Sequence, residues 1–145
     1  MRQSFHRIVC IYGITAVIFF LIDLLWIGIL ANDFYAENIG GLLRDSVNWP
    51  AAFLFYLIYI GGIVHFVLVP SLDSGKGMFD VALKGGLLGL FAYGTFDLTA
   101  LALLKDWPVA VTIVDMAWGT FLTAAVSSSS LWIANIVLKT GGRSR

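Results

Sequence analysis

Four long apolar stretches, separated by short polar segments, dominate the pattern of this 145-residue chain. They cover about residues 8–31, 50–69, 79–104 and 108–138. A helix needs roughly 20 apolar residues to cross the hydrocarbon core of a bilayer, and each stretch is about that long. The pattern therefore predicts an all-α fold: a polytopic integral membrane bundle of four transmembrane helices, forming a single membrane domain over residues 1–145.

Prolines mark several of the expected boundaries. Pro50 suits the first turn of the second helix, and Pro70 is expected to stop that helix near Val69. Pro108 opens the fourth helix after a very short link. The serine run at positions 127–130 has apolar flanks, so it is expected inside the fourth span, where hydroxyls can bond to backbone carbonyls.

The composition supports a membrane protein and excludes some partners. Hydrophobic residues make up 59% of the chain and charged residues 12%, about half the charged share of a typical soluble domain. The lipid bilayer is therefore the expected partner. Because the formal net charge is zero, there is no basic field of the kind that nucleic acid attracts, and no nucleic-acid partner is expected.

Basic residues predict the orientation, because cytoplasmic flanks are enriched in Lys and Arg. One side of the predicted bundle carries only Arg44 and Lys105. The other side carries most of the positive charge: Arg2, Arg7, Lys76, Lys84, Lys139, Arg143 and Arg145. This asymmetry predicts that both the N-terminus and the C-terminus lie in the cytoplasm.

The most informative residues are three acids inside the predicted spans, Asp23, Asp97 and Asp115. At 1.5 Å per residue, each lies roughly 12–15 Å below the first charged residue at the outer end of its helix. A charged side chain facing lipid at such depth costs about 2.5–3.5 kcal/mol. All three are therefore expected to face the interior at one level, where they hold a proton or a cation between them.

Neighbours at helical spacing complete the expected proton, cation or ligand site: Tyr93, Thr112, Tyr56, Tyr59 and Trp118. On the third helix, Gly85, Gly86 and Gly89 form a small-residue face that allows close packing. A purely structural role is the alternative, since a protonated Asp can hydrogen-bond across helices and hold a bundle together.

No catalytic motif or cofactor signature is present. The chain contains neither H-E-x-x-H nor G-x-S-x-G nor a P-loop, so we assign no catalytic residue and whether it is an enzyme stays open. Two histidines and one cysteine do not favour a zinc site. A Mg²⁺ or Ca²⁺ site built from the three Asp side chains remains open, because hard cations prefer carboxylate oxygens.

Several short motifs follow one another along the chain: D-L-L-W-I-G at 23–28, F-Y at 34–35, F-A-Y-G-T-F-D-L-T at 91–99, W-P at 107–108 and D-M-A-W-G at 115–119. Their order resembles an uncharacterised bacterial family of predicted membrane proteins with a domain of unknown function and four transmembrane helices. The resemblance implies a multi-pass protein of the bacterial inner membrane, and it supplies no activity or substrate. Ala100 stands where many relatives have Asn, so Asp97 is expected to lack that polar partner.

Three functions remain in competition at this point. The first is proton- or cation-coupled transport of a small solute through the Asp cluster, with a homodimer as an option. The second is a membrane enzyme acting on a lipid or isoprenoid. The third is a non-catalytic accessory subunit of a membrane complex. Fold alone does not decide among them.

Overall fold

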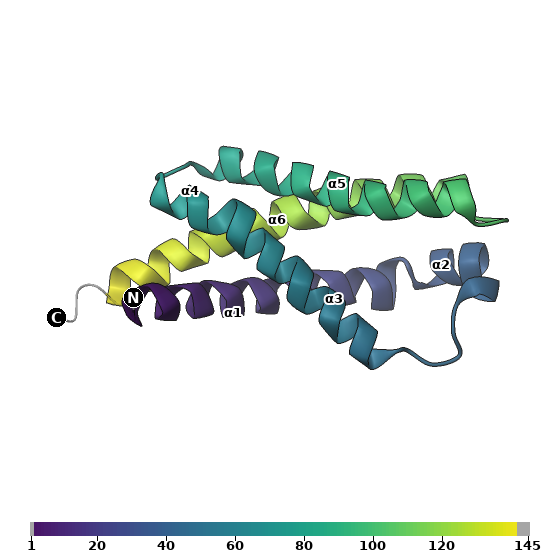
Figure 1. The fold of residues 1–145 in the computed structure, drawn as a ribbon, viewed down its shortest axis with the longest axis horizontal. Helices are drawn as coiled ribbons and strands as arrows, with labels where there is room; N and C mark the ends of the chain where they lie inside the picture. Colours follow the sequence, from purple (N-terminus) through teal and green to yellow (C-terminus); the bar gives the residue numbers. More distant parts are fainter. Residues whose placement is uncertain (1, 142–145) are drawn as a thin grey trace.

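Figure 1 shows the computed structural model, which describes the backbone of residues 2–141 and the side chains of residues 5–138. Every secondary-structure element of the described backbone is a helix, and none is a strand. Four helical segments are long and apolar enough to cross a membrane: Phe5–Leu30, Trp49–Asp73, Met78–Leu103 and Val109–Leu138. The predicted all-α fold with four such helices is confirmed, while the orientation of the termini stays a prediction.

The first span continues into a short helix that the sequence pattern did not predict. Helix α1 (Arg2–Leu25) passes into a π-helical segment, η1 (Trp26–Leu30). After Ala31 the chain forms α2 (Asn32–Ile39) and a 3-10 turn, η2 (Gly40–Leu42). We expected a polar connection here; instead α2 brings side chains back towards the bundle.

The second span does not stop at Pro70, so that prediction was wrong. Helix α3 (Trp49–Gly62) begins at an Asn48 cap, whose Oδ1 accepts from the Ala51 N–H at 3.3 Å. It continues through a π-helical segment, η3 (Ile63–Leu68), into α4 (Val69–Asp73). Pro70 falls in the first turn of α4, where its missing N–H removes no bond that the new segment needs.

Helices α5 (Met78–Leu103) and α6 (Val109–Gly141) form a closely packed hairpin. The predicted glycine face makes this approach possible. A Cβ atom added to Gly89 would lie 2.1 Å from the carbonyl oxygen of Gly119, and one added to Gly85 would lie 2.7 Å from that of Thr123. The two backbones are therefore in direct contact, as small residues allow between membrane helices.

The serine run lies inside α6, as predicted, but its hydroxyls have different surroundings. Ser128 Oγ donates to the carbonyl oxygen of Ala124 at 2.8 Å. The hydroxyls of Ser127 and Ser130 are buried and have no hydrogen-bond partner among the described residues. The predicted hydrogen bonds from serine hydroxyls to backbone carbonyls therefore form in only part of this run.

The helices define two ends of the bundle, visible in Figure 1. The start of α1, α4 and the end of α6 lie at one end, which we call the α4 end. Helix α2 and the start of α3 lie at the other, the α2 end. At the α4 end, Arg7 and Asp73 form an ion pair with an N–O distance of 2.7 Å. Towards the α2 end, α3 runs obliquely to the other spans, and its Phe53 is 70% exposed.

Much of the apolar surface of the bundle is left for lipid to cover. In an apolar stretch of 18 residues within each span, only 22% to 33% of the residues are buried inside the bundle. Of the basic residues that predict orientation, Arg143 and Arg145 lie outside the described residues, as do the side chains of Arg2 and Lys139.

The α5–α6 contact makes Gly89 sensitive to the smallest side chain. Gly89→Ala forces a methyl group against the Gly119 backbone, and we expect it to destabilise the protein by about 1–3 kcal/mol, the usual range for overpacking. Thermal unfolding in detergent measures the effect. Gly13→Ala is the matched control because nothing lies within 4 Å of a Cβ there; an equal loss in both variants would contradict the close contact.

Candidate functional site

Asp97 of α5 is the most unusual side chain of the interior. It is 0% exposed, and neither carboxyl oxygen has a hydrogen-bond partner among the described residues. The neighbouring Ala100, 7% exposed, offers no polar group, as the resemblance to the family led us to expect. An unpartnered carboxylate in such surroundings is costly, and a bound proton or cation removes much of that cost.

Asp115 of α6 lies near Asp97, close enough for the two carboxyl groups to interact electrostatically. It is half-buried and accepts a hydrogen bond from the hydroxyl of Tyr35. The Tyr35 oxygen in turn accepts from Trp26 Nε1 at 3.2 Å. A chain of hydrogen bonds thus leads from η1 through α2 to a carboxyl group of α6.

Tyr35 lies outside the four candidate spans, on α2. Burial raises the pKa of its phenol well above the ordinary value of 10.0, and the hydrogen bond to Asp115 raises that pKa further. The phenol therefore keeps its proton at physiological pH and acts as a donor towards the carboxyl group.

Asp23 of α1 has a different set of partners. It is 3% exposed, and its Oδ2 accepts from the Tyr56 hydroxyl of α3 at 2.8 Å. The Trp118 indole of α6 lies near this carboxyl group, but its Nε1–H is buried and does not reach hydrogen-bond geometry with any described atom. Trp118 stacks on Trp26 with 4.2 Å between ring centroids and 8° between planes.

Two tyrosines lie between these acids. Tyr93 of α5 interacts electrostatically with both Asp23 and Asp115, and its ring packs against Gly119, where a Cβ would be 2.2 Å away. Tyr59 of α3 lies 6.2 Å from Tyr93, centroid to centroid. The Tyr59 hydroxyl is 2.7 Å from Thr123 Oγ1. Since Thr123 donates its own proton to the Gly119 carbonyl, Tyr59 is the donor of this pair.

The structure therefore brings Asp97 and Asp115 together and connects Asp23 to them through the aromatic residues between. Seven of the eight predicted site residues belong to this assembly. Thr112 is used differently: it is buried, and its hydroxyl accepts from Trp107 Nε1 at 3.1 Å, which fastens the α5–α6 link. That these groups form a proton or ligand site stays a prediction.

A cavity of about 340 Å³ adjoins the cluster, and we call it the Asp115 cavity. Its walls come from α3, α5 and α6, and its lining residues are Phe55, Tyr59, Ala92, Tyr93, Phe96 and Asp115. Four of the six are aromatic, and Asp115 alone is charged. A volume in this range suits a small ligand.

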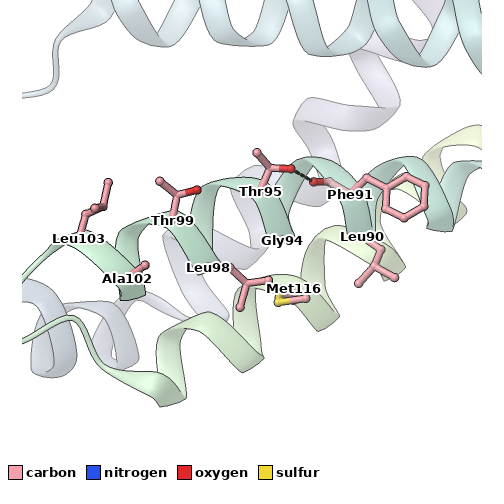
Figure 2. A pocket seen from close by; sticks show the side chains of 9 residues that line it. All are labelled: Leu90, Phe91, Gly94, Thr95, Leu98, Thr99, Ala102, Leu103 and Met116. Atoms are coloured by element: carbon pink, nitrogen blue, oxygen red, sulfur yellow. Dashed lines mark hydrogen bonds between the residues drawn. The ribbon is translucent and has the colours of Figure 1, made fainter.

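A larger hollow, of about 620 Å³, lies along α5, and we call it the α5 groove. Figure 2 shows its lining residues, nearly all from one side of α5, with Met116 of α6 at its base. No charged group lines it, and its Thr95 hydroxyl donates to the Phe91 carbonyl of its own helix at 2.6 Å. Exposed apolar neighbours such as Leu103 identify it as a furrow facing lipid. None of the acids and tyrosines of the cluster lines this groove.

Sequence reasoning missed several participants. Phe55, Ala92 and Phe96 could have been found from helical spacing, because Phe55 is four residues before Tyr59, Phe96 is three residues after Tyr93, and Ala92 is four residues before Phe96. Tyr35 belongs to the F-Y motif at 34–35, but it was not assigned to the site because it lies in a segment that we interpreted as a polar connection.

The cluster is not arranged as a metal centre. Among the described residues, no group of three or more His, Cys, Asp or Glu side chains is placed to hold a metal ion. Asp23 and Asp115 already accept hydrogen bonds from tyrosines. The arrangement is suited to exchanging protons or binding an organic cation.

These features define the class of the molecule: a polytopic α-helical membrane protein with acidic side chains buried between its spans. Within that class, residues 8–132 match the profile of the predicted membrane protein family DUF2177, a family of unknown function, and the chain belongs to this family. The resemblance inferred from its motifs is thereby confirmed. No curated protein and no solved structure matches the chain.

Removing the Tyr35 hydroxyl tests the link between α2 and the cluster. Tyr35→Phe leaves the ring and deletes the donor to Asp115, so we expect a loss of stability of about 1.5–3 kcal/mol, as for a hydrogen bond to a charged group. Thermal unfolding in detergent measures it. Tyr12→Phe is the control, because Tyr12 donates only to a backbone carbonyl, that of Leu57 at 3.0 Å; a larger loss there would argue against the link.

Proposed function

We propose that this protein couples the movement of protons to the transport of a small solute, with Asp97 and Asp115 as the exchanging groups. The observation that supports this most directly is the complete burial of Asp97, with no hydrogen-bond partner for either carboxyl oxygen in the part of the chain that the structure describes. An ionisable residue inside a membrane span is expensive, and such residues commonly mark ion and substrate pathways.

The two carboxyl groups have complementary positions for exchange. Asp115 is half-buried and lines the Asp115 cavity, so it is the group that a solute meets. Asp97 lies behind it, fully buried and within electrostatic reach. Because two nearby negative charges repel each other, a cation arriving at Asp115 favours loss of a proton from the pair, and departure of the cation favours proton uptake.

The other titratable groups around Asp97 and Asp115 are engaged in hydrogen bonds or ring packing, so we assign proton exchange to these two acids. Tyr35 from α2 donates to Asp115, Tyr59 from α3 donates to Thr123, and Asp23 from α1 is paired with Tyr56. Tyr93 of α5 lies between the acids and contributes ring surface to the cavity. Among the three acids, Asp97 alone accepts no hydrogen bond from the residues that the structure describes.

This arrangement favours transport over the other two functions. A structural Asp in an accessory subunit is expected to hydrogen-bond across helices, as Asp23 does but Asp97 does not. An enzyme that holds a metal with its acids would need converging ligands, and the described residues offer no such group. Two spans also contain π-helical segments, which are frequent at functional sites.

Proton movement in proteoliposomes tests the proposal. Purified protein is reconstituted with a pH-sensitive dye inside the vesicles, and sodium, potassium, alanine or benzyltrimethylammonium is added outside. We expect at least one solute to drive proton release, and Asp97→Asn to slow that release about tenfold or more, a barrier change of roughly 1.4 kcal/mol.

Asp80→Asn is the matched control. Asp80 is an exposed acid in the first turn of the same helix, so its replacement is expected to leave the rate within about twofold, a change of less than 0.5 kcal/mol. Absence of proton movement with every solute, or equal rates in the wild type and Asp97→Asn, would overturn the proposal.

A further inference from the structure

The lining of the Asp115 cavity carries information about its ligand. Its aromatic walls come from two helices, with Phe55 and Tyr59 on α3 and Tyr93 and Phe96 on α5. The faces of aromatic rings attract cations, and more strongly where water is excluded. Among the described residues that line the cavity there is no Lys or Arg, and the one charged group is the Asp115 carboxyl.

The carboxyl groups beside the cavity also favour a cationic ligand. Asp115 already accepts the Tyr35 hydroxyl, and Asp97 adds two carboxyl oxygens that have no donor among the described residues. A neutral or anionic ligand would leave these oxygens uncompensated, whereas a positive charge at the cavity lowers the energy of the whole pair.

The route to the cavity sets the character of the rest of the ligand. Phe55 and Phe96 belong to its lining and are 46% and 62% exposed, so the cavity is open where these two side chains lie. Both lie within the candidate spans, at the level that lipid covers. A ligand that passes between α3 and α5 therefore has to tolerate a hydrocarbon environment on its way.

We propose that the Asp115 cavity binds small hydrophobic ammonium cations, with an aromatic or other apolar group held between the rings of α3 and α5 and the cationic nitrogen beside Asp115. This inference rests on the proposed function and names the solute class that exchanges with the proton. A quaternary ammonium ion has no acidic proton on nitrogen, so any proton released when it binds comes from the protein.

Direct binding tests the solute class separately from transport. Benzyltrimethylammonium combines one aromatic ring with a permanent charge, and neopentylbenzene has the same shape with carbon in place of nitrogen. Binding to full-length protein in lipid nanodiscs is followed by calorimetry. We expect the cation to bind about tenfold or more tightly than the neutral isostere, as one strong electrostatic contact provides.

Two kinds of variant locate the site. Asp115→Asn removes the charge, and Ala92→Phe fills the cavity while leaving every carboxyl group in place; each is expected to weaken cation binding about tenfold or more. Ala102→Phe is the matched control, since it places the same bulk on the same helix but in the α5 groove (Figure 2). It is expected to bind the cation like the wild type.

The outcomes separate this inference from the proposed function. Equal affinity for the neutral isostere, no binding of the cation, or loss of binding in Ala102→Phe with retention in Ala92→Phe would overturn the assignment of the ligand class and site. Proton release driven by sodium or alanine alone would also overturn it, while leaving coupled transport intact. Cation binding without any proton movement would instead remove the transport proposal.

Discussion

Gly89 and Gly119 allow the backbones of α5 and α6 to touch, and the positions of the polar groups follow from that contact. A Cβ atom at position 89 would lie 2.1 Å from the Gly119 carbonyl oxygen, so only glycine fits at that position of α5 in the observed register. That register places Asp97 beside Asp115 and lays the ring of Tyr93 over Gly119. In lipid, where burial of apolar surface gives helices no reason to associate, such close packing is what holds two spans together.

The remaining spans are arranged around this hairpin. Helix α1 packs on α6 and brings Asp23 to the level of Trp118, while α3 contributes tyrosine donors and then departs obliquely towards the α2 end. The oblique course of α3 leaves room for the Asp115 cavity between its aromatic side chains and those of α5. Close contact on one side of α5 and separation on the other thus place a fully buried carboxyl group, Asp97, and a half-buried one, Asp115, next to an accessible space.

Much of this architecture was predictable because the bilayer restricts the choices. A run of apolar residues of sufficient length has to be a helix, since unpaired backbone groups are too costly in lipid. The same cost requires acids in the spans to turn inward, which is why Asp23 and Asp97 could be placed in the interior from position alone. The glycine face on α5 was visible for an equally simple reason, the absence of side chains at helical spacing.

The predictions failed where local hydrogen bonding, not hydropathy, decides the course of the chain. Pro70 was expected to end a helix, but the π-helical turn before it changes the register and lets the span continue to Asp73. Tyr35 was missed because α2 is too short and too polar to stand out by periodicity. Whether an acid has a partner also depends on side-chain positions that the linear sequence does not reveal.

The hydrogen bond from Tyr35 to Asp115 has a consequence for communication across the membrane surface. It joins a helix that lies outside the spans to a carboxyl group inside them, so the position of α2 and the state of that carboxyl group are thermodynamically linked. By this linkage, an agent that displaces α2 and thereby changes the proton affinity of that carboxyl group has its own affinity changed by the same factor when the proton binds.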